Sequence, residues 1–181
     1  MLRLISYDMR CGFNSNIKKI IFFVVLIITY NFIGHNEITV FSSNCGIKPD
    51  ILDYYCYVLG GTKFIPENMI EIYQIPVMWL MIQIMIAYVI GYYAITDLHR
   101  YGQHVLLRSS SRLKWWGSKI IWNMFTVILM YLIVFGITFL NGYISGAGFK
   151  WELTEEICVG VCNLNFIPKS RNVVYIFLFV M

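Results

Sequence analysis

The sequence predicts an all-α, polytopic integral membrane protein with three full transmembrane helices and the start of a fourth. Of its 181 residues, 59% are hydrophobic and only 13% are charged, whereas an ordinary soluble domain has about 25% charged residues. The apolar residues also form long continuous runs, and most basic residues lie in two segments beside those runs. These observations favour a chain whose solvent is largely lipid.

The distribution of charge predicts how the chain is oriented. Nine of the fourteen Lys and Arg residues fall in segments 1–19 and 97–119, each of which holds one acid, while segments 35–75 and 142–172 hold eight of the ten acids. Since cytoplasmic loops accumulate Lys and Arg, we expect the first two segments inside and the other two outside. The basic residues lie beside the spans, which favours membrane lipids as their partner and argues against nucleic acid.

The first predicted span, residues 20–34, is short for a bilayer core that needs about 20 residues. Lys18 and Lys19 can extend their ammonium groups to the interface, and the helix can continue toward Val40 and Phe41. A secretory signal peptide is the alternative, since a basic region precedes the apolar run. No cleavage site of small residues follows it, so we favour a span.

Two further spans have the expected length. Residues 76–96 begin at Pro76, which suits the first turn of a helix. Residues 120–141 have Trp115, Trp116 and Trp122 near their inner end, as interfacial aromatic residues would be. A fourth apolar run, residues 173–181, is too short to cross a bilayer. We expect that the sequence continues beyond it, because a carboxylate left in hydrocarbon is costly.

Both outer segments contain signals for short helices. Asp50 or Asp53 can cap a helix over the apolar residues 51–59, which we expect to fold onto the membrane surface. Residues 151–161 of the second outer segment form another candidate helix.

The inner segment predicts two helical pieces that meet at a run of serines. In the first piece, Leu98, Tyr101 and Val105 share an apolar stripe, and Ser111 can cap the second piece. The polar side chains of the segment are Arg100, His104, Arg108 and Arg112. The segment is either a connector on the lipid surface or a docking element for a cytoplasmic partner.

Several sequence features together resemble a known family. They are the segment LISYDMRCGF before the first span, the segment Ile-Pro-Val-Met-Trp-Leu that begins the second, and Asp97-Leu98 followed by Arg108, Arg112, Trp115-Trp116 and Ser118-Lys119. This arrangement is similar to that of the type-2 ABC exporter permeases of Gram-positive bacteria. Members of the family usually have six spans, so the chain corresponds to an N-terminal part.

The resemblance implies a function in export across the bacterial cell membrane. Residues 2–12 would be the connecting helix, and residues 98–113 would be the coupling helix that docks on an ABC ATPase subunit through Arg100, His104, Arg108 and Arg112. A second permease copy or a homologue would complete the transporter. No phosphate-binding Gly-x4-Gly-Lys-Ser/Thr motif occurs, so we expect the chain to be no enzyme and to hold no cofactor, with ATP hydrolysis by the partner subunit.

The cysteines suggest an alternative function. Cys45 and Cys56 lie in the first outer segment, and Cys158 and Cys162 lie in the second, which is also the layout of membrane-bound disulfide-generating oxidoreductases. Ten and three residues separate the members of each pair, so neither pair is the Cys-x2-Cys motif. Structural disulfides or unpaired thiols are the simpler interpretation. A stand-alone immunity or accessory membrane protein is the remaining alternative.

Polar residues within the spans are few. We expect Asn31, Gln83 and Asn123 to form hydrogen bonds between helices. The predicted spans hold no charged residue, which argues against a relay for protons or ions. The three histidines are dispersed between the two sides of the membrane, so the sequence predicts no metal site.

Overall fold

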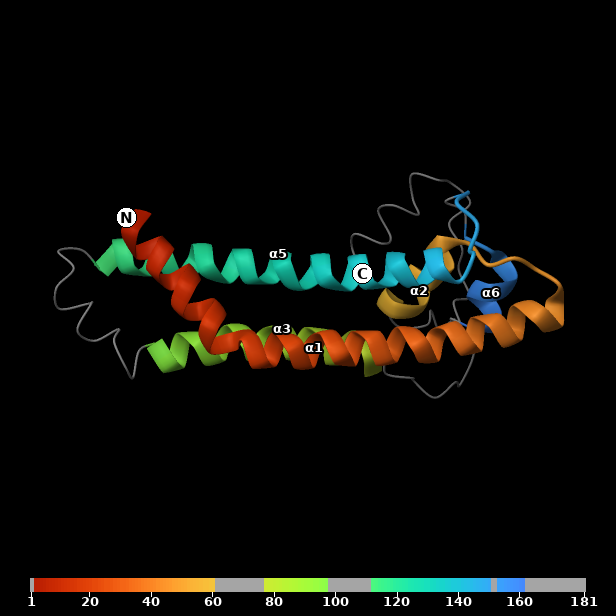
Figure 1. Ribbon diagram of the computed structural model, residues 1–181, viewed down its shortest axis with the longest axis horizontal. Helices are drawn as coiled ribbons and strands as arrows, with labels where there is room; N and C mark the ends of the chain where they lie inside the picture. The colour runs from red at the N-terminus through yellow and green to blue at the C-terminus, as the bar shows by residue number, and fades with distance from the viewer. Residues whose placement is uncertain (1, 61–76, 98–111, 151–152, 162–181) are drawn as a thin grey trace, which may run out of the picture. The chain divides into compact units, whose positions relative to one another are not determined.

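The computed structural model describes residues 2–60, 77–97, 112–150 and 153–161, and these residues form helices without strands. Figure 1 shows the elements. The helices are α1 (Leu2–Cys45), α2 (Ile51–Leu59), α3 (Val77–Asp97), α5 (Arg112–Ile144) and α6 (Glu155–Gly160). The predicted all-α fold is therefore confirmed. The predicted inner helix and the predicted fourth span lie outside the described residues, apart from the start of α5.

Two stretches, Leu4–Cys45 in α1 and Trp115–Ile144 in α5, are long and apolar enough to cross a membrane, and α3 contributes a shorter apolar stretch, Val77–Tyr93. All three predicted spans are helical, but α1 and α5 extend well beyond the predicted limits of 20–34 and 120–141. With 44 residues, α1 is about 66 Å long. The helix is continuous over this length although it contains polar residues and glycines. Proline, which would interrupt it, is absent from α1.

Both α1 and α5 end at a glycine in the left-handed conformation. Gly46 and Gly146 each have a φ of 70°. The following residue donates its N–H back over the last turn, from Ile47 to the Ser42 carbonyl and from Ala147 to the Gly142 carbonyl, each at 3.1 Å. This is the Schellman pattern, which satisfies carbonyl groups that the helix itself leaves without donors. Local sequence therefore determines where the two longest helices end.

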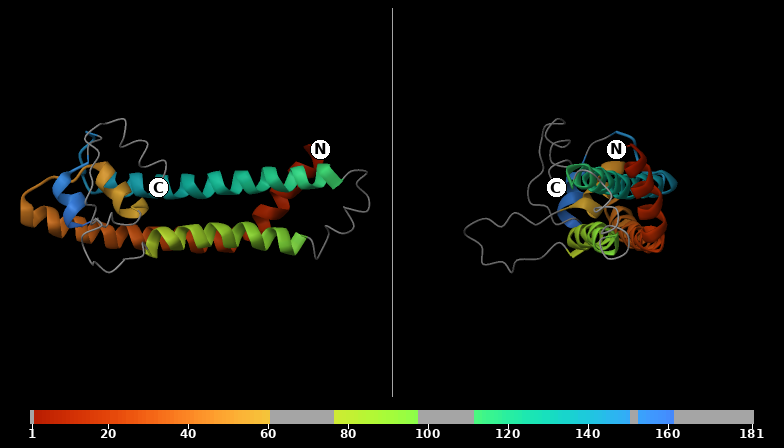
Figure 2. Two further views of the ribbon diagram at one scale, coloured as in Figure 1. Left: turned by 180° about the vertical axis from the view of Figure 1, so that it is seen from behind. Right: turned by 90° about the vertical axis from the view of Figure 1, so that its left-hand side faces the viewer.

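The chain divides into two compact units. The first comprises residues 1–25 and 82–134, and the second comprises residues 26–81 and 135–181. In the first unit, α1 packs against both α3 and α5, and its initial turns run obliquely to these helices (Figures 1 and 2). The buried side of α1 follows a four-residue repeat at Asp8, Gly12, Asn16 and Ile20. Such a repeat forms one ridge on a helix, although here half of its side chains are polar.

The closest contact in the first unit involves a glycine. A Cβ atom placed on Gly12 would lie 2.5 Å from the Trp122 ring, so only glycine lets α1 approach α5 this closely. Trp122 also packs against Tyr93 of α3, with 5.2 Å between the ring centroids. Gln83 of α3 donates to the Tyr131 hydroxyl of α5 at 2.7 Å, which confirms the hydrogen bond between helices predicted for Gln83.

The second unit is built around α2. Eight of the nine residues of α2 are buried, so the helix forms part of a core instead of lying on a surface with one side exposed. Asp50 is its N-cap residue, as predicted, and Asp53 in the first turn accepts the Asp50 N–H at 2.9 Å. An isolated bridge joins Asp50 to Gly148.

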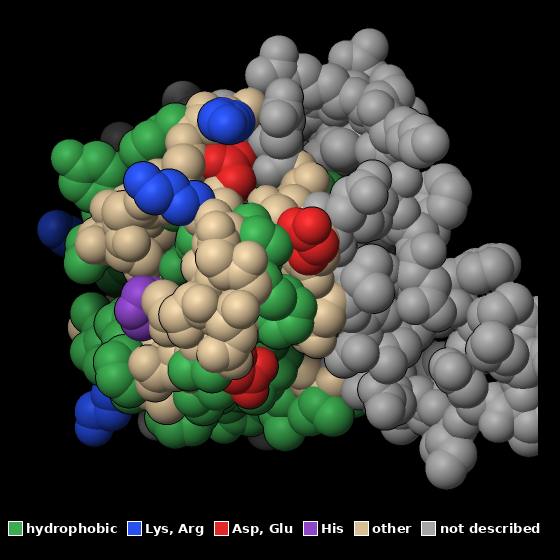
Figure 3. Space-filling view, turned by 90° about the vertical axis from the view of Figure 1, so that its right-hand side faces the viewer, with side chains coloured by type: hydrophobic (Ala, Val, Ile, Leu, Met, Phe, Trp, Pro, Cys, Tyr) green, Lys and Arg blue, Asp and Glu red, His purple; other side chains and the backbone are tan. Residues whose placement is uncertain are grey.

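The second candidate helix is α6, which is shorter than the predicted 151–161. The face shown in Figure 3 carries acidic and basic side chains among polar and apolar ones.

Gly12 provides a test of the packing in the first unit. We expect Gly12→Ala to lower the free energy of unfolding by about 1–3 kcal/mol, because the added methyl group must displace the Trp122 ring. Gly91→Ala is the matched control, since nothing lies within 4 Å of its added Cβ atom and alanine favours the helix by about 1 kcal/mol. The measurement is unfolding of the purified protein in detergent micelles. Equal stabilities for the two variants would contradict the close packing of α1 on Trp122.

Candidate functional site

Most of the residues that the sequence singles out for docking lie outside the described residues. Arg100, His104 and Arg108 belong to segment 98–111, and Arg112 is the first residue of α5. The docking role of these four residues stays a prediction. The structure does describe the helical ends that flank the segment, namely the end of α3 at Asp97 and the start of α5 at Arg112.

The cysteines of the described residues are not joined by disulfides. Cys45 is exposed, whereas Cys56 and Cys158 are buried. The structure therefore contains no Cys45–Cys56 bridge, and Cys162 lies outside the described residues. The Cys158 thiol lies 3.9 Å from the Asp53 carboxylate and packs in the core of the second unit. Cys56 and Cys158 therefore occupy positions typical of small buried side chains.

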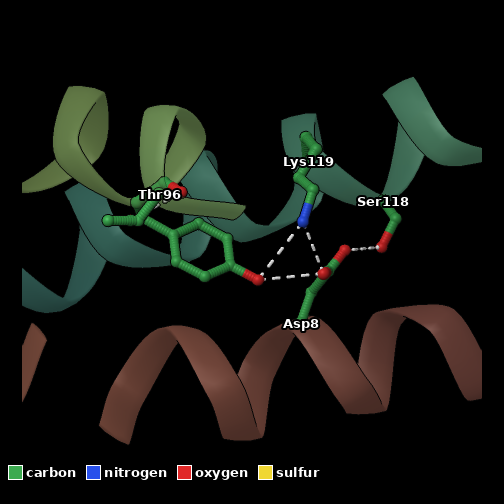
Figure 4. A network of polar contacts seen from close by, with 5 residues as sticks. Asp8, Thr96, Ser118 and Lys119 are labelled. Carbon is green, nitrogen blue, oxygen red and sulfur yellow. Dashed lines mark hydrogen bonds and ion pairs between the residues drawn. The ribbon is translucent and has the colours of Figure 1, made fainter. Parts of the chain in front are cut away.

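The structure brings together four residues that sequence reasoning did not connect. Asp8 of α1, Tyr93 of α3, and Ser118 and Lys119 of α5 form a buried polar cluster in the first unit, shown in Figure 4. We call these four residues the Asp8 cluster. Each is at most 5% exposed. A charged pair with so little exposure to solvent is the most unusual feature of the described chain, because a buried charge requires a partner.

The Asp8 carboxylate is the centre of this cluster. Its Oδ1 accepts the Lys119 ammonium at 2.6 Å and the Tyr93 hydroxyl at 2.9 Å, and its Oδ2 accepts the Ser118 hydroxyl. Lys119 also donates to the Tyr93 oxygen at 3.2 Å. Both carboxylate oxygens therefore have donors, and the two opposite charges neutralise each other. Charge-assisted hydrogen bonds of this kind are stronger than those between neutral groups.

Aromatic rings complete the surroundings of the ammonium group. Lys119 Nζ lies 4.6 Å from the centroid of the Tyr93 ring and 5.6 Å from that of Trp115. These distances are within the range of cation–π attraction. The cluster therefore has a charged centre, three hydrogen-bond donors to one carboxylate, and two aromatic rings near the ammonium group.

A second layer of polar contacts lies about two helical turns farther along α1, at Asn16, and continues to Lys19. Asn16 donates to the Val89 carbonyl of α3 at 3.5 Å, and Lys19 donates to Asn16 at 3.3 Å. The Lys19 ammonium also lies over the rings of Tyr88 and Tyr92. The polar face of α1 thus continues from Asp8 to Lys19 and is directed toward α3 and α5.

The Asp8 cluster is suited to holding helices together. Its carboxylate and ammonium are both occupied, and neither has the exposure that a substrate would need to reach it. It joins α1 to the last turns of α3 and to the second turn of α5, which are the two helical ends on either side of segment 98–111. A displacement of that segment would therefore act on helices that Asp8 links directly to α1.

The sequence contained a signal for part of this arrangement. Asp8 is the only acid among the first 36 residues, and it lies in helical register with Gly12, Asn16 and Ile20. That register places small and polar residues on one face, as in interfaces between helices in membranes. The choice of Lys119 as its partner could not be deduced, since Lys18, Lys19 and Lys114 are equally basic and belong to the same predicted side.

The second unit has its own network around Asp53. Its carboxylate accepts the backbone N–H of Thr154 at 3.0 Å and the Thr154 hydroxyl at 2.8 Å, besides the N–H of Asp50. Burial raises the pKa of the Asp53 carboxyl above its ordinary value, while these hydrogen bonds oppose the rise. Asp50 in turn accepts the N–H of Lys150 at 3.0 Å. The two aspartates join α2 to the segment that precedes α6.

His35 also belongs to a contact within the second unit. Its Nδ1 lies 2.9 Å from the Ser145 hydroxyl and 3.4 Å from the Tyr54 hydroxyl. The sequence indicated a surface histidine. In the structure His35 is a half-buried residue of α1 that contacts α2 and the residue after α5. No group of His, Cys, Asp and Glu among the described residues is arranged to hold a metal ion.

Comparison with family models, with curated proteins and with solved structures found no match to this chain.

The Asp8 cluster predicts a specific pattern of stabilities. Asp8→Asn and Lys119→Met should each lower the free energy of unfolding in micelles by about 3–5 kcal/mol, because each leaves a buried charge without its partner. The double variant should lose less than the sum of the two, since it removes both charges together. Lys18→Met is the control and should change little, because Lys18 is exposed. Strictly additive losses would show that the two residues act independently.

Proposed function

We propose that the chain is a multi-pass membrane protein whose three long helices α1, α3 and α5 cross the bilayer. The observation that carries this proposal is the apolar surface of these helices. In the first unit alone, a dozen large apolar side chains are more than half exposed. They are Ile21, Phe22, Val25, Ile84, Tyr88, Ile95, Leu113, Trp116, Ile120, Met124, Ile128 and Leu132.

The magnitude of this exposure favours lipid over water. Full burial of one such side chain contributes about 1.5–3 kcal/mol, so half-exposure in water forgoes roughly 1 kcal/mol. A dozen of them forgo roughly 10 kcal/mol, which is as large as the net stability of a typical soluble domain, about 5–15 kcal/mol. Lipid removes this cost. The same unit buries the polar residues Asp8, Asn16, Ser118, Lys119 and Thr126 together with apolar ones, while the twelve apolar side chains above lie on its surface.

The orientation that we propose places the N-terminus and segment 97–119 in the cytoplasm and segments 35–75 and 142–172 outside. Asp8 neutralises Lys119 inside the fold, so the remaining basic residues of the two inner segments determine the orientation. Arg10 and Lys18 are exposed at the beginning of α1. The excess of Lys and Arg on the inner side is the usual signature of cytoplasmic loops.

Within this class, we propose that the chain belongs to the permease component of an ABC-type exporter in a bacterial cell membrane. The proposal is supported by the resemblance of residues 4–13, 75–80 and 97–119 to that family. An ATPase subunit would bind segment 98–113 through Arg100, His104, Arg108 and Arg112, and a second permease copy or a homologue would complete the pathway. The Asp8 cluster fits this function, because it connects the helices on both sides of the docking segment to α1.

Cysteine labelling in intact cells tests the orientation. In a variant without native cysteines, Lys63→Cys and Lys150→Cys should react with a membrane-impermeant maleimide, because both positions lie in the predicted outer segments. Ser110→Cys should react only after the membrane is permeabilised. Reaction of Ser110→Cys in intact cells would contradict the orientation and with it the cytoplasmic docking of this segment.

Charge reversal tests the interaction with an ATPase. The variant Arg100→Glu with Arg108→Glu should reach the membrane but co-purify with its ATPase at least a hundredfold less, because like charges at an interface cost several kcal/mol. Lys48→Glu with Lys150→Glu, on the predicted outer side, is the control and should retain the partner. Labelling at Ser110→Cys in the same background checks that the orientation is unchanged. Wild-type co-purification of the first variant would remove the residue-level support for the permease proposal.

A further inference from the structure

The outward face of the first turns of α1 carries an alternation of basic and apolar side chains. Arg10 and Lys18 are exposed, and between and beside them Tyr7, Phe13 and Ile17 are each about two-fifths exposed, at 40%, 39% and 39%. Tyr7, Arg10, Phe13 and Ile17 follow one another at spacings of three and four residues and Lys18 is next to Ile17, which places all five on one side of the helix. This side is opposite the buried ridge of Asp8, Gly12, Asn16 and Ile20. We call these five exposed residues the basic stripe.

Within residues 1–25, no exposed acid balances the basic stripe. Asp8 is the only acid in residues 1–25, and its carboxylate is buried against Lys119 on the other side of the helix. Among the described residues, no ion pair is shown for Arg10 or Lys18, whereas Asp8 is paired with Lys119. The fold therefore withdraws the one negative charge of this segment and leaves two positive charges exposed.

We propose that the basic stripe binds the headgroup of an anionic phospholipid in the inner leaflet. This inference rests on the proposed membrane orientation, which places the start of α1 at the cytoplasmic interface. Arg10 and Lys18 provide donors for a phosphate group, and arginine in particular can bind two phosphate oxygens at once. Phe13 and Ile17 provide apolar contacts beside them, and Tyr7 adds an amphipathic ring of the kind enriched at membrane interfaces. Water-soluble anionic partners would match the charges but would leave these apolar side chains exposed.

The first experiment measures stabilisation by lipid. Purified protein in neutral detergent micelles is titrated with phosphatidylglycerol or with phosphatidylcholine, and the thermal midpoint is followed, because a ligand that binds the folded state raises it. We expect phosphatidylglycerol to raise the midpoint at concentrations at which phosphatidylcholine does not. Inorganic phosphate, added in place of the lipid, should have little effect. Equal effects of the two lipids, or an equal effect of inorganic phosphate, would overturn the proposal.

Variants then assign the effect to the stripe. Each basic residue near an anionic membrane surface contributes about fivefold in affinity, so Arg10→Gln with Lys18→Gln should weaken the response to phosphatidylglycerol about thirtyfold. Arg10→Lys with Lys18→Arg keeps both charges and should retain the response. Lys48→Gln with Lys150→Gln lies on the predicted outer side and should also retain it. An unchanged response of the Arg10→Gln, Lys18→Gln variant would overturn the assignment to this face.

A membrane-extraction assay separates this inference from the membrane proposal on which it rests. If detergent extracts every variant from membranes and carbonate washing does not, the membrane proposal is upheld, whichever phospholipid raises the thermal midpoint. A protein released by carbonate would contradict the membrane proposal, and the lipid site would fall with it.

Discussion

The ion pair between Asp8 and Lys119 is the interaction on which the arrangement of the first unit depends. It joins the first turns of α1 to α5, and through the Tyr93 hydroxyl it includes α3. Such a pair is not stabilising simply because it is charged, since removing two ions from water costs several kcal/mol each. Its value lies in specificity. The carboxylate has three donors from two helices and the ammonium lies near two aromatic rings, so a shift of any one of the three helices would separate these groups.

The same unit shows why a membrane environment and this pair are compatible. Helices whose outer surfaces are apolar gain nothing from the hydrophobic effect when they associate in lipid, so packing and polar contacts must hold them together. Gly12 allows close packing on Trp122, and Gln83 reaches Tyr131. The second unit follows another principle: its core is the buried α2, and the aspartates Asp50 and Asp53 tie backbone groups of neighbouring loops to it. The two units therefore differ in the interactions that stabilise them.

Sequence reasoning predicted the helices well because their signals are local. Long apolar runs and an aspartate at the N-cap of α2 act within a few residues. The extent of α1 was underestimated, because the predicted span was limited to the apolar run, whereas the polar residues on either side of that run do not interrupt the helix. The Asp8 cluster was missed because it joins residues 85 to 111 positions apart, and charge counting treated Lys119 as one exposed cation among several. The predicted docking residues stay predictions, since segment 98–111 lies outside the described residues.

Exchange of the two charges tests most directly the claim that this pair organises the first unit. Asp8→Lys combined with Lys119→Asp keeps one charge of each sign at the same two positions, whereas each change alone places two like charges together. We expect either single variant to unfold in micelles at a much lower denaturant concentration than the wild type, and the exchanged variant to recover most of the loss. An exchanged variant no more stable than the single ones would contradict the account, and so would single variants as stable as the wild type.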